Sequence, residues 1–443
     1  MSTLPRAIEY PGPKARSIIE RMRAVEGAGP RTATGDPLVI DRAFGSTLVD
    51  PDGNEFTDLA GSFAAANIGH SHPAVAEAVA DQVGRASHVS SAAVSEQRVG
   101  FEEDLLGIAP VGLDRVLLGI SGADANDTAL KLARSATGRR EVLTFSGGYF
   151  GRAGGVIGLS GKTTFRSRVG RDVEAHFLPF PDPYRWPDEL GGPTRAGDAA
   201  LALVRAAVED PASGIGPLAA IVVEPVQGNG GVVVPPDGFL QGLRRICDSL
   251  RIPLVFDEIQ SGFGRTGRMW AGEHWDVVPD LMTVGKGIGG GMALSAVVGR
   301  EALMSHWPAG THTSTFLGNA VNLAAGRAAV AVMRRERLFE RSARLGDALC
   351  ARLSADLADA PPVGGVRGLG LFIGIELVRD RQTREPDAER CAAVRRWAFE
   401  HGVVVATAGR YENVIKISPP LTIDEGQAQA AVAVVVDAIR AVA

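Results

Sequence analysis

The stretch LVFDEIQSGFGRTG, from Leu254 to Gly267, combines an apolar run with a glycine-rich turn, and an acidic residue, Asp257, ends the run. A short apolar run of this kind is typical of a buried strand in a parallel sheet. Ligands bind at the carboxyl ends of such strands, which is where Asp257 would stand. A lone Asp most often caps the next turn, so the role of Asp257 depends on what else the chain brings to the same edge.

A second element is Lys286, in the glycine-rich stretch GKGIGGGM directly after the apolar run Leu281 to Val284. A lysine on a glycine-rich turn is usually solvated. Here the glycines would let the backbone pass close to a planar cofactor while the lysine amine reaches an aldehyde on it. The carboxylate of Asp257 would keep a pyridine nitrogen protonated, which makes such a ring an electron sink for a carbanion.

A third element is SGADANDTALKLAR, from Ser121 to Arg134, where a strand turns into a helix. The backbone amides of Gly122 and Ala123 would lie at the helix N-terminus and bind a phosphate. By itself this is an ordinary capped start of a helix. Together with Asp257 and Lys286 it predicts a phosphate-binding turn, an acid for a ring nitrogen and a lysine for an aldehyde, which is the set that pyridoxal 5'-phosphate requires.

The first two thirds of the chain alternate strand-like and helix-like stretches. Runs rich in β-branched residues are separated by amphipathic stretches such as Asp127 to Ser135 and Asp198 to Glu209. This alternation predicts a mostly parallel sheet covered by helices on both faces. The stretch Gly161 to Pro193 interrupts the pattern and is expected to be a long surface excursion. The expected strands are Arg115 to Ile120, Glu141 to Phe145, Leu218 to Val223, Pro253 to Phe256, Leu281 to Val284 and Ser295 to Val298.

A smaller unit of mixed α and β structure is expected in the C-terminal part of the chain. A helical stretch from Phe316 to about Leu357 leads into it. Its expected elements are a strand at Leu371 to Leu377, a helix near Ala388 to Glu400, strands at Val403 to Ala406 and Asn413 to Ile417, and a last helix from Glu425 to Ala441.

Composition and charge exclude several classes of function. The chain has 443 residues and a net charge of -5 without a block of Lys and Arg, so neither nucleic acid nor a membrane is an expected partner. The most apolar stretch, Ala430 to Val436, is too short to span a bilayer. The first residues, Met1 to Ala15, lack the apolar run of a signal peptide. Three widely spaced cysteines, Cys247, Cys350 and Cys391, are interpreted as buried thiols of a cytoplasmic protein.

These stretches resemble the class III pyridoxal-phosphate-dependent aminotransferases of fold type I, a family whose members act on 4-aminobutyrate, ornithine and other omega-amino acids. The resemblance covers nearly the whole chain, and its most specific part is DEIQSGFGRTG with the later Lys286. It implies an α/β fold, with a large domain on a mostly parallel seven-stranded sheet and a small α+β domain. Other matching stretches are FGSTLVDPDGNEFTDLAGSFAAANIGHSHP (Phe44 to Pro73), GGYFGR, EPVQGNGG, HTSTFLGN, VRGLGLFIGIEL and NVIKISPPLTI.

The resemblance also implies how the chain is divided. Residues 1–60 form an N-terminal segment that packs with the small domain. Residues 61–320 form the large domain, which binds the cofactor, and residues 321–443 form the small domain.

The resemblance assigns the cofactor-binding roles. Lys286 forms the internal aldimine and, once substrate has freed it, moves a proton between the substrate α-carbon and C4' of the cofactor. Asp257 pairs with the pyridinium nitrogen, and Gln260 forms a hydrogen bond near the phenolic O3'. Tyr149, in GGYFGR, stacks on the ring, although an aromatic residue at a strand end would otherwise be assigned to the core. Thr315, in HTSTF, reaches the phosphate of the neighbouring subunit. That role implies a homodimer with shared active sites, and a dimer of dimers stays open.

Four residues bear on the substrate. In relatives that use 2-oxoglutarate, an arginine at the position of Arg152 binds the distal carboxylate, and a glutamate at the position of Glu224 pairs with an arginine of the small domain. This chain has Lys416 in place of that arginine. A lysine keeps the charge but lacks the bidentate fork, so dicarboxylate recognition is weakened or differently built. Phe63 stands where ornithine-type relatives carry a carboxylate-binding tyrosine, and it favours a partly apolar substrate.

A metal is not expected. His70 and His72, in GHSHP, have a spacing that suggests a metal, but no third ligand is near them in the sequence.

Two reaction outcomes fit the same cofactor residues. The first is an aminotransferase that moves an amino group from an amine or amino acid to a keto acid, 2-oxoglutarate or pyruvate, by a ping-pong route. The alternative is an amino-acid racemase or epimerase, or a lyase, because PGPKARSIIERM (Pro11 to Met22) also occurs in relatives of that kind. A non-catalytic cofactor-binding protein is disfavoured by the intact Lys286, Asp257 and Arg152. The donor, the acceptor and the stereochemistry stay open.

Overall fold

A computed structural model describes residues 7–28, 37–90, 92–167 and 174–442, and within them the largest element is a seven-stranded sheet of order β4-β10-β9-β8-β7-β5-β6. Strand β10 is antiparallel to both of its neighbours, and the other pairs are parallel. The prediction of a mostly parallel sheet is therefore confirmed. The strands are β4 (Arg115–Gly119), β5 (Glu141–Phe145), β6 (Ala175–Leu178), β7 (Leu218–Val223), β8 (Leu254–Asp257), β9 (Leu281–Val284) and β10 (Ser295–Gly299).

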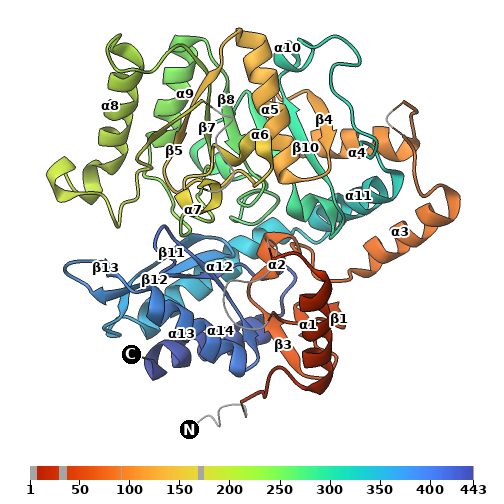
Figure 1. Ribbon diagram of the computed structural model, residues 1–443, viewed down its shortest axis with the longest axis vertical. Coiled ribbons are helices and arrows are strands. Elements are labelled where there is room, and N and C mark those ends of the chain that lie inside the picture. The colour runs from red at the N-terminus through yellow and green to blue at the C-terminus, as the bar shows by residue number, and fades with distance from the viewer. Residues whose placement is uncertain (1–6, 29–36, 91, 168–173, 443) are drawn as a thin grey trace.

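Both faces of this sheet are buried, because successive side chains of a strand point to opposite faces. Val222 and Val255 pack in one core cluster with the apolar face of helix α5 (Gly122–Thr137). Their neighbours Val223 and Phe256 pack in another cluster with helices α8 (Ala196–Glu209) and α9 (Phe239–Leu250). The continuous apolar runs that the sequence shows are thus needed on both sides of the strands. Figure 1 shows these helices around the sheet in the upper half of the molecule.

The site is placed by the direction of the strands. Strands β5, β7, β8 and β9 run parallel, so their carboxyl ends meet at one edge of the sheet. The residues that end or closely follow these strands are Tyr149, Glu224, Asp257 and Lys286. Four residues from four separate stretches of sequence are therefore brought to one edge, as expected for a doubly wound sheet.

The C-terminal part forms a second, five-stranded sheet among the described residues, with the order β11-β12-β16-β15 and with β13 paired to β12. Its printed strand pairs are antiparallel. Three helices lie with it, which agrees with the expected small α+β unit (Figure 1). The elements are α12 (Leu338–Asp356), β11 (Val363–Leu369), β12 (Phe372–Asp380), β13 (Glu385–Pro386), α13 (Ala388–Glu400), β15 (Ala406–Ala408), β16 (Val414–Ile417) and α14 (Glu425–Ala441).

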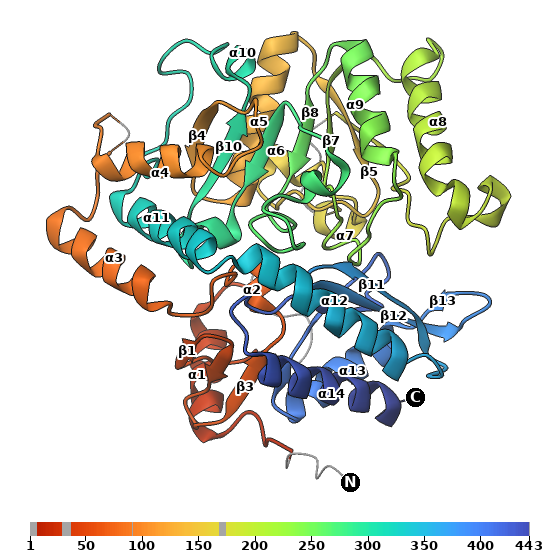
Figure 2. The same ribbon diagram turned by 180° about the vertical axis from the view of Figure 1, so that it is seen from behind.

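The N-terminal part lies beside this second unit. Strand β3 (Glu55–Asp58) pairs in parallel with β14 (Val403–Val404), within a sheet of order β1-β2-β3-β14. Figures 1 and 2 both show α1 and β3 next to the elements near the C-terminus. Of the segment 1–60, residues 1–6 and 29–36 lie outside the described residues, and the division at 60 and 320 stays a prediction. The other elements here are α1 (Pro13–Val25), β1 (Arg42–Phe44) and β2 (Thr47–Val49).

Several expectations about local structure were wrong. The stretch Gly161 to Pro193 is not wholly a surface excursion, because its residues Ala175–Leu178 form the edge strand β6, paired with β5. This strand is short and only half-buried, so it lacks the apolar run that marks the inner strands. Residues 168–173 of the stretch lie outside the described part of the chain. The helical stretch from Phe316 to Leu357 is two helices, α11 (Ala320–Arg335) and α12, separated where Arg337 takes a left-handed conformation with φ 48°.

Helix α11 packs against α3 (Pro73–Arg85) and α4 (Glu96–Leu106), below the large sheet. No helix in the described part of the chain is long and apolar enough to cross a membrane. The remaining short elements are α2 (Gly61–Ala64), α6 (Gly154–Ile157), α7 (Thr163–Arg166), α10 (Glu301–Met304), and the 3-10 helices η1 (Asp188–Leu190), η2 (Pro193–Arg195), η3 (Ala271–Trp275) and η4 (Lys286–Gly289).

Candidate active site

A cavity of about 220 Å³ opens at the edge where the parallel strands end. It brings together eight of the residues that the sequence singled out. These are Gly122, Ala123, Tyr149, Arg152, Glu224, Asp257, Gln260 and Lys286. Three other predicted residues, Phe63, Thr315 and Lys416, are not part of its lining.

Asp257 ends β8 and is 4% exposed. Its Oδ2 accepts a hydrogen bond from Nδ2 of Asn126 at 2.7 Å, and its Oδ1 accepts one from the amide of Ile259 at 2.9 Å. Burial raises the pKa of Asp257 to about 6, although the two hydrogen bonds and the nearby Lys286 amine oppose the shift. The group is therefore a fixed, ionised carboxylate at neutral pH, and a buried carboxylate of this kind calls for a positive partner.

Asn126 is a site residue that the sequence interpretation missed. Its side chain also donates to the carbonyl of Phe150 at 3.0 Å and accepts from the hydroxyl of Thr283 at 2.8 Å, so that its orientation is fixed. A signal existed in the sequence, because Asn126 stands four residues after Gly122 and therefore on the same face of α5.

Lys286 follows β9 as the first residue of η4 and has a left-handed backbone, with φ 48°. Such a conformation is strained for a residue with a side chain, and strain of this kind is concentrated at functional sites. The next residue must be small, because a Cβ on Gly287 would lie 2.8 Å from Cγ of Asn67. Burial lowers the pKa of Lys286, and the carboxylates of Asp257 and Glu224 oppose the shift. Burial thus favours the neutral amine, which is the nucleophilic form.

The N-terminus of α5 also lines the cavity. The hydroxyl of Ser121 caps this helix by accepting from the amide of Asp124 at 3.2 Å. The first amides of a helix have no carbonyl partner within the helix, so those of Gly122 and Ala123 can bind an anion. Close packing also requires glycine around them. A Cβ on Gly122 would meet Ile259 at 2.9 Å, and one on Gly151 would meet the Cβ of Ala123 at 2.5 Å.

Glu224 follows β7 and is 5% exposed. Its two oxygens accept from the amides of Tyr149 at 2.8 Å and Gly228 at 2.9 Å. Burial raises the pKa of Glu224 to about 8, and the Asp257 carboxylate adds to the shift. Glu224 is therefore largely protonated at neutral pH, in spite of two amide donors.

Lys416 lies on β16 and is 1% exposed. Its amine forms no ion pair with a carboxylate of the described residues, so the expected pairing with Glu224 is absent from this structure. Burial lowers the pKa of Lys416 to about 7, the charge of Lys286 adds to that shift, and Glu224 opposes it. The two groups thus lie close enough to influence each other without direct contact.

Phe63 and Thr315 lie on the surface of the single chain. The side chain of Phe63 is 67% exposed, in a turn where Ser62, Phe63 and Ala64 all have positive φ angles. Thr315 is exposed next to Phe316, which is 56% exposed.

Arg410 is a second residue that the sequence interpretation missed. Its Nε and Nη2 are buried and have no hydrogen-bond partner among the described residues. It lies against the turn that leads to Tyr149, since a Cβ on Gly147 would be 3.4 Å from its Nε. No sequence motif marks this residue as functional, because it lies in an ordinary loop between β15 and β16.

The histidines of GHSHP have structural contacts. Nε2 of His70 is 2.8 Å from Oδ2 of Asp58, and Nδ1 of His72 accepts from the amide of Ala74 at the start of α3. In the described ranges, no group of three or more His, Cys, Asp or Glu side chains could hold a metal ion.

The family model for class-III aminotransferases matches residues 29–439. The chain belongs to the class-III aminotransferase family. Diaminobutyrate--2-oxoglutarate aminotransferase of Rhizobium meliloti (strain 1021) is 36% identical over 403 residues, which are 88% of this chain and 85% of that enzyme. Isoleucine 2-epimerase of Lentilactobacillus buchneri is 38% identical over 414 residues, which are 91% of this chain and 90% of that enzyme.

A solved structure of a transaminase agrees with the fold. An amine transaminase from an uncultivated Pseudomonas species, in its form with bound pyridoxal phosphate, has a TM-score of 0.86 at 30% identity and covers 94% of this chain and 98% of that one. The predicted family, fold class and cofactor are thereby confirmed.

Class-III aminotransferases depend on pyridoxal phosphate, and the residues of this cavity fit that group. The cofactor needs an anion site for its phosphate, a carboxylate for its ring nitrogen and a neutral amine for its aldehyde. The N-terminus of α5, the buried Asp257 and the buried Lys286 supply these three groups in one cavity. The close packing at Gly122 and Gly151 excludes a larger side chain at either position.

Proposed function

We propose that this class-III aminotransferase moves an amino group from an amine or amino acid to a keto acid, 2-oxoglutarate or pyruvate, by a ping-pong route. The observation that supports it best is the presence of Lys286 and Asp257 in one cavity with the N-terminus of α5. When bound, the cofactor supplies a conjugated ring that accepts the electron pair of a broken bond at the substrate carbon.

Each residue then has a task that follows from its surroundings. Asp257 keeps the ring nitrogen protonated, because its carboxylate is ionised above pH 6. The burial of Lys286 favours its neutral amine, which would take a proton from the α-carbon of the substrate. The same amine would then deliver that proton to C4' of the cofactor. The amides of Gly122 and Ala123 would hold the phosphate of the cofactor, and Tyr149, which lines the same cavity, would lie against its ring.

The decisive experiment mixes the enzyme with a panel of amines in the absence of any keto acid. An aminotransferase converts its cofactor into pyridoxamine phosphate under these conditions, which absorbance at the cofactor band follows. A racemase or epimerase, the alternative that the similarity to isoleucine 2-epimerase favours, would instead exchange the α-hydrogen in D₂O with no accumulation of pyridoxamine phosphate.

Glu224 and Lys416 supply a means to accept two kinds of substrate in turn. Between pH 7 and pH 8 the protonated carboxyl and the neutral amine are both favoured, so the pair carries little charge when an uncharged substrate end lies nearby. An entering carboxylate favours the charged amine on Lys416. Dicarboxylates and neutral amines can therefore use the same space.

Replacing Arg152 by alanine is expected to damage acceptor use, because its guanidinium is a planar fork for a carboxylate. Arg152 lines the cavity and is exposed in the single chain, so we expect a loss of about 2 kcal/mol, at the lower end for removal of one partner of a charge pair. That loss is about 30-fold in kcat/KM.

The measurement is the rate of each half-reaction taken separately. Arg152→Lys is the matched control, since it keeps the charge and removes the fork, and it should recover part of the acceptor rate. Reaction with a carboxylate-free amine donor should be nearly unaffected in both variants. An equal loss with donor and acceptor would contradict this role of Arg152.

The preference for 2-oxoglutarate over pyruvate is expected to depend on pH through Lys416. The pKa of its amine is about 7, so the cation is present below pH 7 and is lost as the pH rises. Lys286, Glu224, Arg265 and Lys162 are the charged groups that act on it. The rate ratio of 2-oxoglutarate to pyruvate should fall with a limiting slope of about tenfold per pH unit above pH 7.

Lys416→Arg removes this titration, because an arginine stays protonated throughout. In that variant the ratio should be higher at pH 8 than in wild type, and between pH 6 and 9 it should change only through Glu224, whose pKa is about 8. The two acceptors differ in the second carboxylate, so the ratio reports the groups that act on that carboxylate. A wild-type ratio that stays constant over this range would show that Lys416 does not contact it.

We also propose a homodimer with active sites shared between subunits, in the cytoplasm. The exposed Phe63 and Phe316 support a covered surface, and three free cysteines, of which Cys350 is only half-buried, fit a reducing compartment.

Thr315→Ala is expected to weaken binding of pyridoxal phosphate without changing the fold, since a hydroxyl bond to a charged phosphate contributes about 1.5 to 3 kcal/mol. Titration of the cofactor by absorbance measures this loss, and Thr315→Ser, which keeps the hydroxyl, should restore binding. Light scattering during gel filtration gives the mass. A monomer that remains fully active in dilute solution would rule out the shared site.

A further inference from the structure

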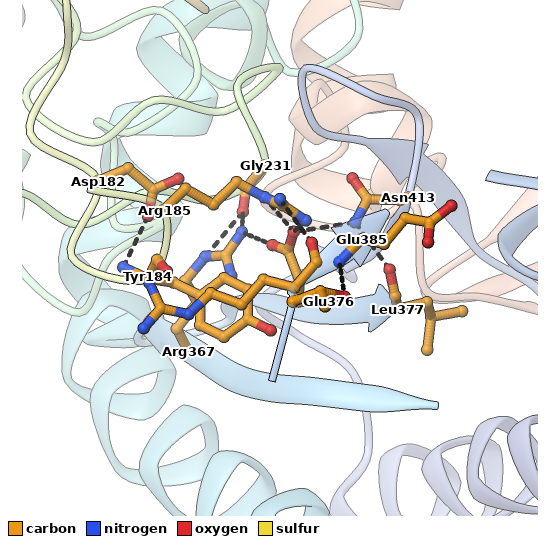
Figure 3. A network of polar contacts seen from close by, with 11 residues as sticks. Asp182, Tyr184, Arg185, Gly231, Arg367, Glu376, Leu377, Glu385 and Asn413 are labelled. Carbon is orange, nitrogen blue, oxygen red and sulfur yellow. Dashed lines mark hydrogen bonds and ion pairs between the residues drawn. The ribbon is translucent and has the colours of Figure 1, made fainter. Parts of the chain in front are cut away.

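A buried carboxylate outside the cavity joins the two parts of the molecule. Glu376 lies on β12 and is 1% exposed (Figure 3). Its Oε1 accepts from Nε of Arg185 at 2.7 Å and from Nδ2 of Asn413 at 2.9 Å, and its Oε2 is 2.6 Å from Nη2 of Arg367. Two guanidinium groups and one amide therefore hold a single carboxylate. The two arginines keep the pKa of Glu376 below its ordinary value in spite of burial, so it stays ionised.

The two arginines differ in what else they contact. Arg367, on β11, also donates from Nη2 to the carbonyl of Gly231 at 2.6 Å and from Nε to the carbonyl of Val232 at 3.1 Å. Arg185, in the loop after β6, donates instead to the carbonyl of Arg384 at 3.0 Å. Both side chains are mostly buried, with 18% and 15% exposure. Of these two arginines, Arg367 is therefore the one that connects Glu376 to the stretch that follows β7.

This stretch, residues 224–233, begins with Glu224, and we call it the Glu224 loop. The loop has internal hydrogen bonds, because the backbones of Gln227 and Val233 form two of them, at 3.1 and 3.0 Å. The amide of Gly231 donates to the carbonyl of Gly228 at 3.2 Å, and the amide of Gly228 donates to Glu224. A contact at Gly231 is therefore linked to the carboxyl group of Glu224 through two hydrogen bonds, one between Gly231 and Gly228 and one between Gly228 and Glu224.

The Glu224 loop also touches the predicted cofactor site. A Cβ on Gly228 would lie 1.9 Å from Oε1 of Gln260, which means that the loop backbone packs directly on that side chain. The amide of Gly409, next to the buried Arg410, donates to the carbonyl of Asn229 at 3.0 Å. A displacement of the loop by a fraction of an ångström would therefore move Glu224 and Gln260 together.

We infer that Arg367, held by Glu376, is a positioning residue for Glu224. The ion pair fixes the guanidinium, the guanidinium fixes the carbonyls of Gly231 and Val232, and the loop then sets where the carboxyl group of Glu224 lies. The inference rests on the proposed function, in which Glu224 helps the cavity accept both neutral and carboxylate-bearing substrates. Arg367 acts through the loop and does not touch the reacting atoms.

The test compares Arg367→Lys with Arg185→Lys in the enzyme with bound cofactor. Both variants keep a cation beside Glu376, but a lysine at 367 cannot hold Glu376 and two carbonyls at once. In Arg367→Lys we expect kcat/KM for 2-oxoglutarate to fall about tenfold, while the half-reaction with a carboxylate-free amine changes less than about twofold. In Arg185→Lys both half-reactions should stay within about twofold of wild type, whatever the change in thermal stability.

Hydrogen exchange supplies a readout that does not depend on the reaction. The amides of residues 226–233 should exchange faster in Arg367→Lys and at the wild-type rate in Arg185→Lys. Equal exchange in both variants would overturn the inference, even if the proposed transamination is correct. Failure of the wild type to transfer an amino group from any amine would overturn the proposed function alone, because the exchange result would stand.

A double-mutant cycle tests whether the effect passes through Glu224. If it does, Arg367→Lys should add little to the acceptor loss of Glu224→Ala, because the group being positioned is already absent. Full additivity would overturn the inference. Should Arg367→Lys fail to fold, Glu376→Gln, which keeps the shape and removes the charge that orients Arg367, replaces it in the same cycle.

Discussion

Replacing Lys286 by alanine is expected to abolish turnover, with a loss of about 10⁴-fold or more, the upper range for removal of a proton-transfer group. The alanine removes both the amine that binds the cofactor aldehyde and the base that moves the proton. None of the four other lysines lines the cavity. Lys14 and Lys131 are exposed. Lys162 forms an ion pair with Glu412, and Lys416 lies on a strand of the second sheet.

Reduction with borohydride gives a direct check, because it fixes the cofactor on the lysine that binds it. The chain has five lysines, so peptide mapping distinguishes them readily. We expect the adduct on Lys286 alone, and Lys131→Ala, a change of an exposed residue on α5, should keep both the adduct and the turnover. An adduct on any other lysine would remove the basis of the cofactor assignment.

The sequence was sufficient for the parts of the fold that depend on continuous apolar runs. The inner strands β7, β8 and β9 are buried on both faces, so their composition identifies them without reference to the rest of the chain. The edge strand β6 is half-buried and owes its conformation to pairing with β5, which no local pattern reveals. An edge strand is identified by the strand with which it pairs, and that partner cannot be read from the local sequence.

The candidate site shows the same division. Asp257 and Lys286 could be named because each follows an apolar strand and because they occur in one chain with the phosphate-binding turn at Gly122. Asn126 was missed because its task is to hold Asp257, and an amide on a helix has many ordinary explanations. Arg367 occurs in the sequence analysis only within the matching stretch VRGLGLFIGIEL, because its partners Glu376 and Gly231 lie on two other segments of the chain.

Replacing Asp257 by asparagine is expected to preserve cofactor binding and to lower the rate by at least about 10²-fold, the lower range for loss of an acid-base group. A neutral amide no longer keeps the ring nitrogen protonated, so the ring accepts electrons less readily. The side-chain NH₂ group of the asparagine would also face another hydrogen-bond donor. Both oxygens of Asp257 accept hydrogen bonds, from Asn126 and from the amide of Ile259, and an asparagine can satisfy only one of them.

Glu258→Gln is the matched control for this change. Glu258 is the next residue, is 2% exposed, and also has both oxygens engaged, by the hydroxyl of Ser261 at 2.7 Å and the amide of Gly272 at 2.8 Å. Burial raises the pKa of Glu258 to about 7, but it does not line the cofactor cavity. Glu258→Gln therefore reproduces the loss of a buried, hydrogen-bonded carboxylate without the loss of a partner for the ring nitrogen.

The comparison separates chemistry from stability. Each variant leaves one buried donor without an acceptor, at a cost of about 1 to 3 kcal/mol, so both should unfold at a lower temperature. Only Asp257→Asn should lose turnover while it still binds the cofactor, measured by absorbance and by single half-reactions with an amine. If Asp257→Asn retained near-normal half-reaction rates, Asp257 would be a structural residue of the β8 end, and the ring nitrogen would need another source of its proton.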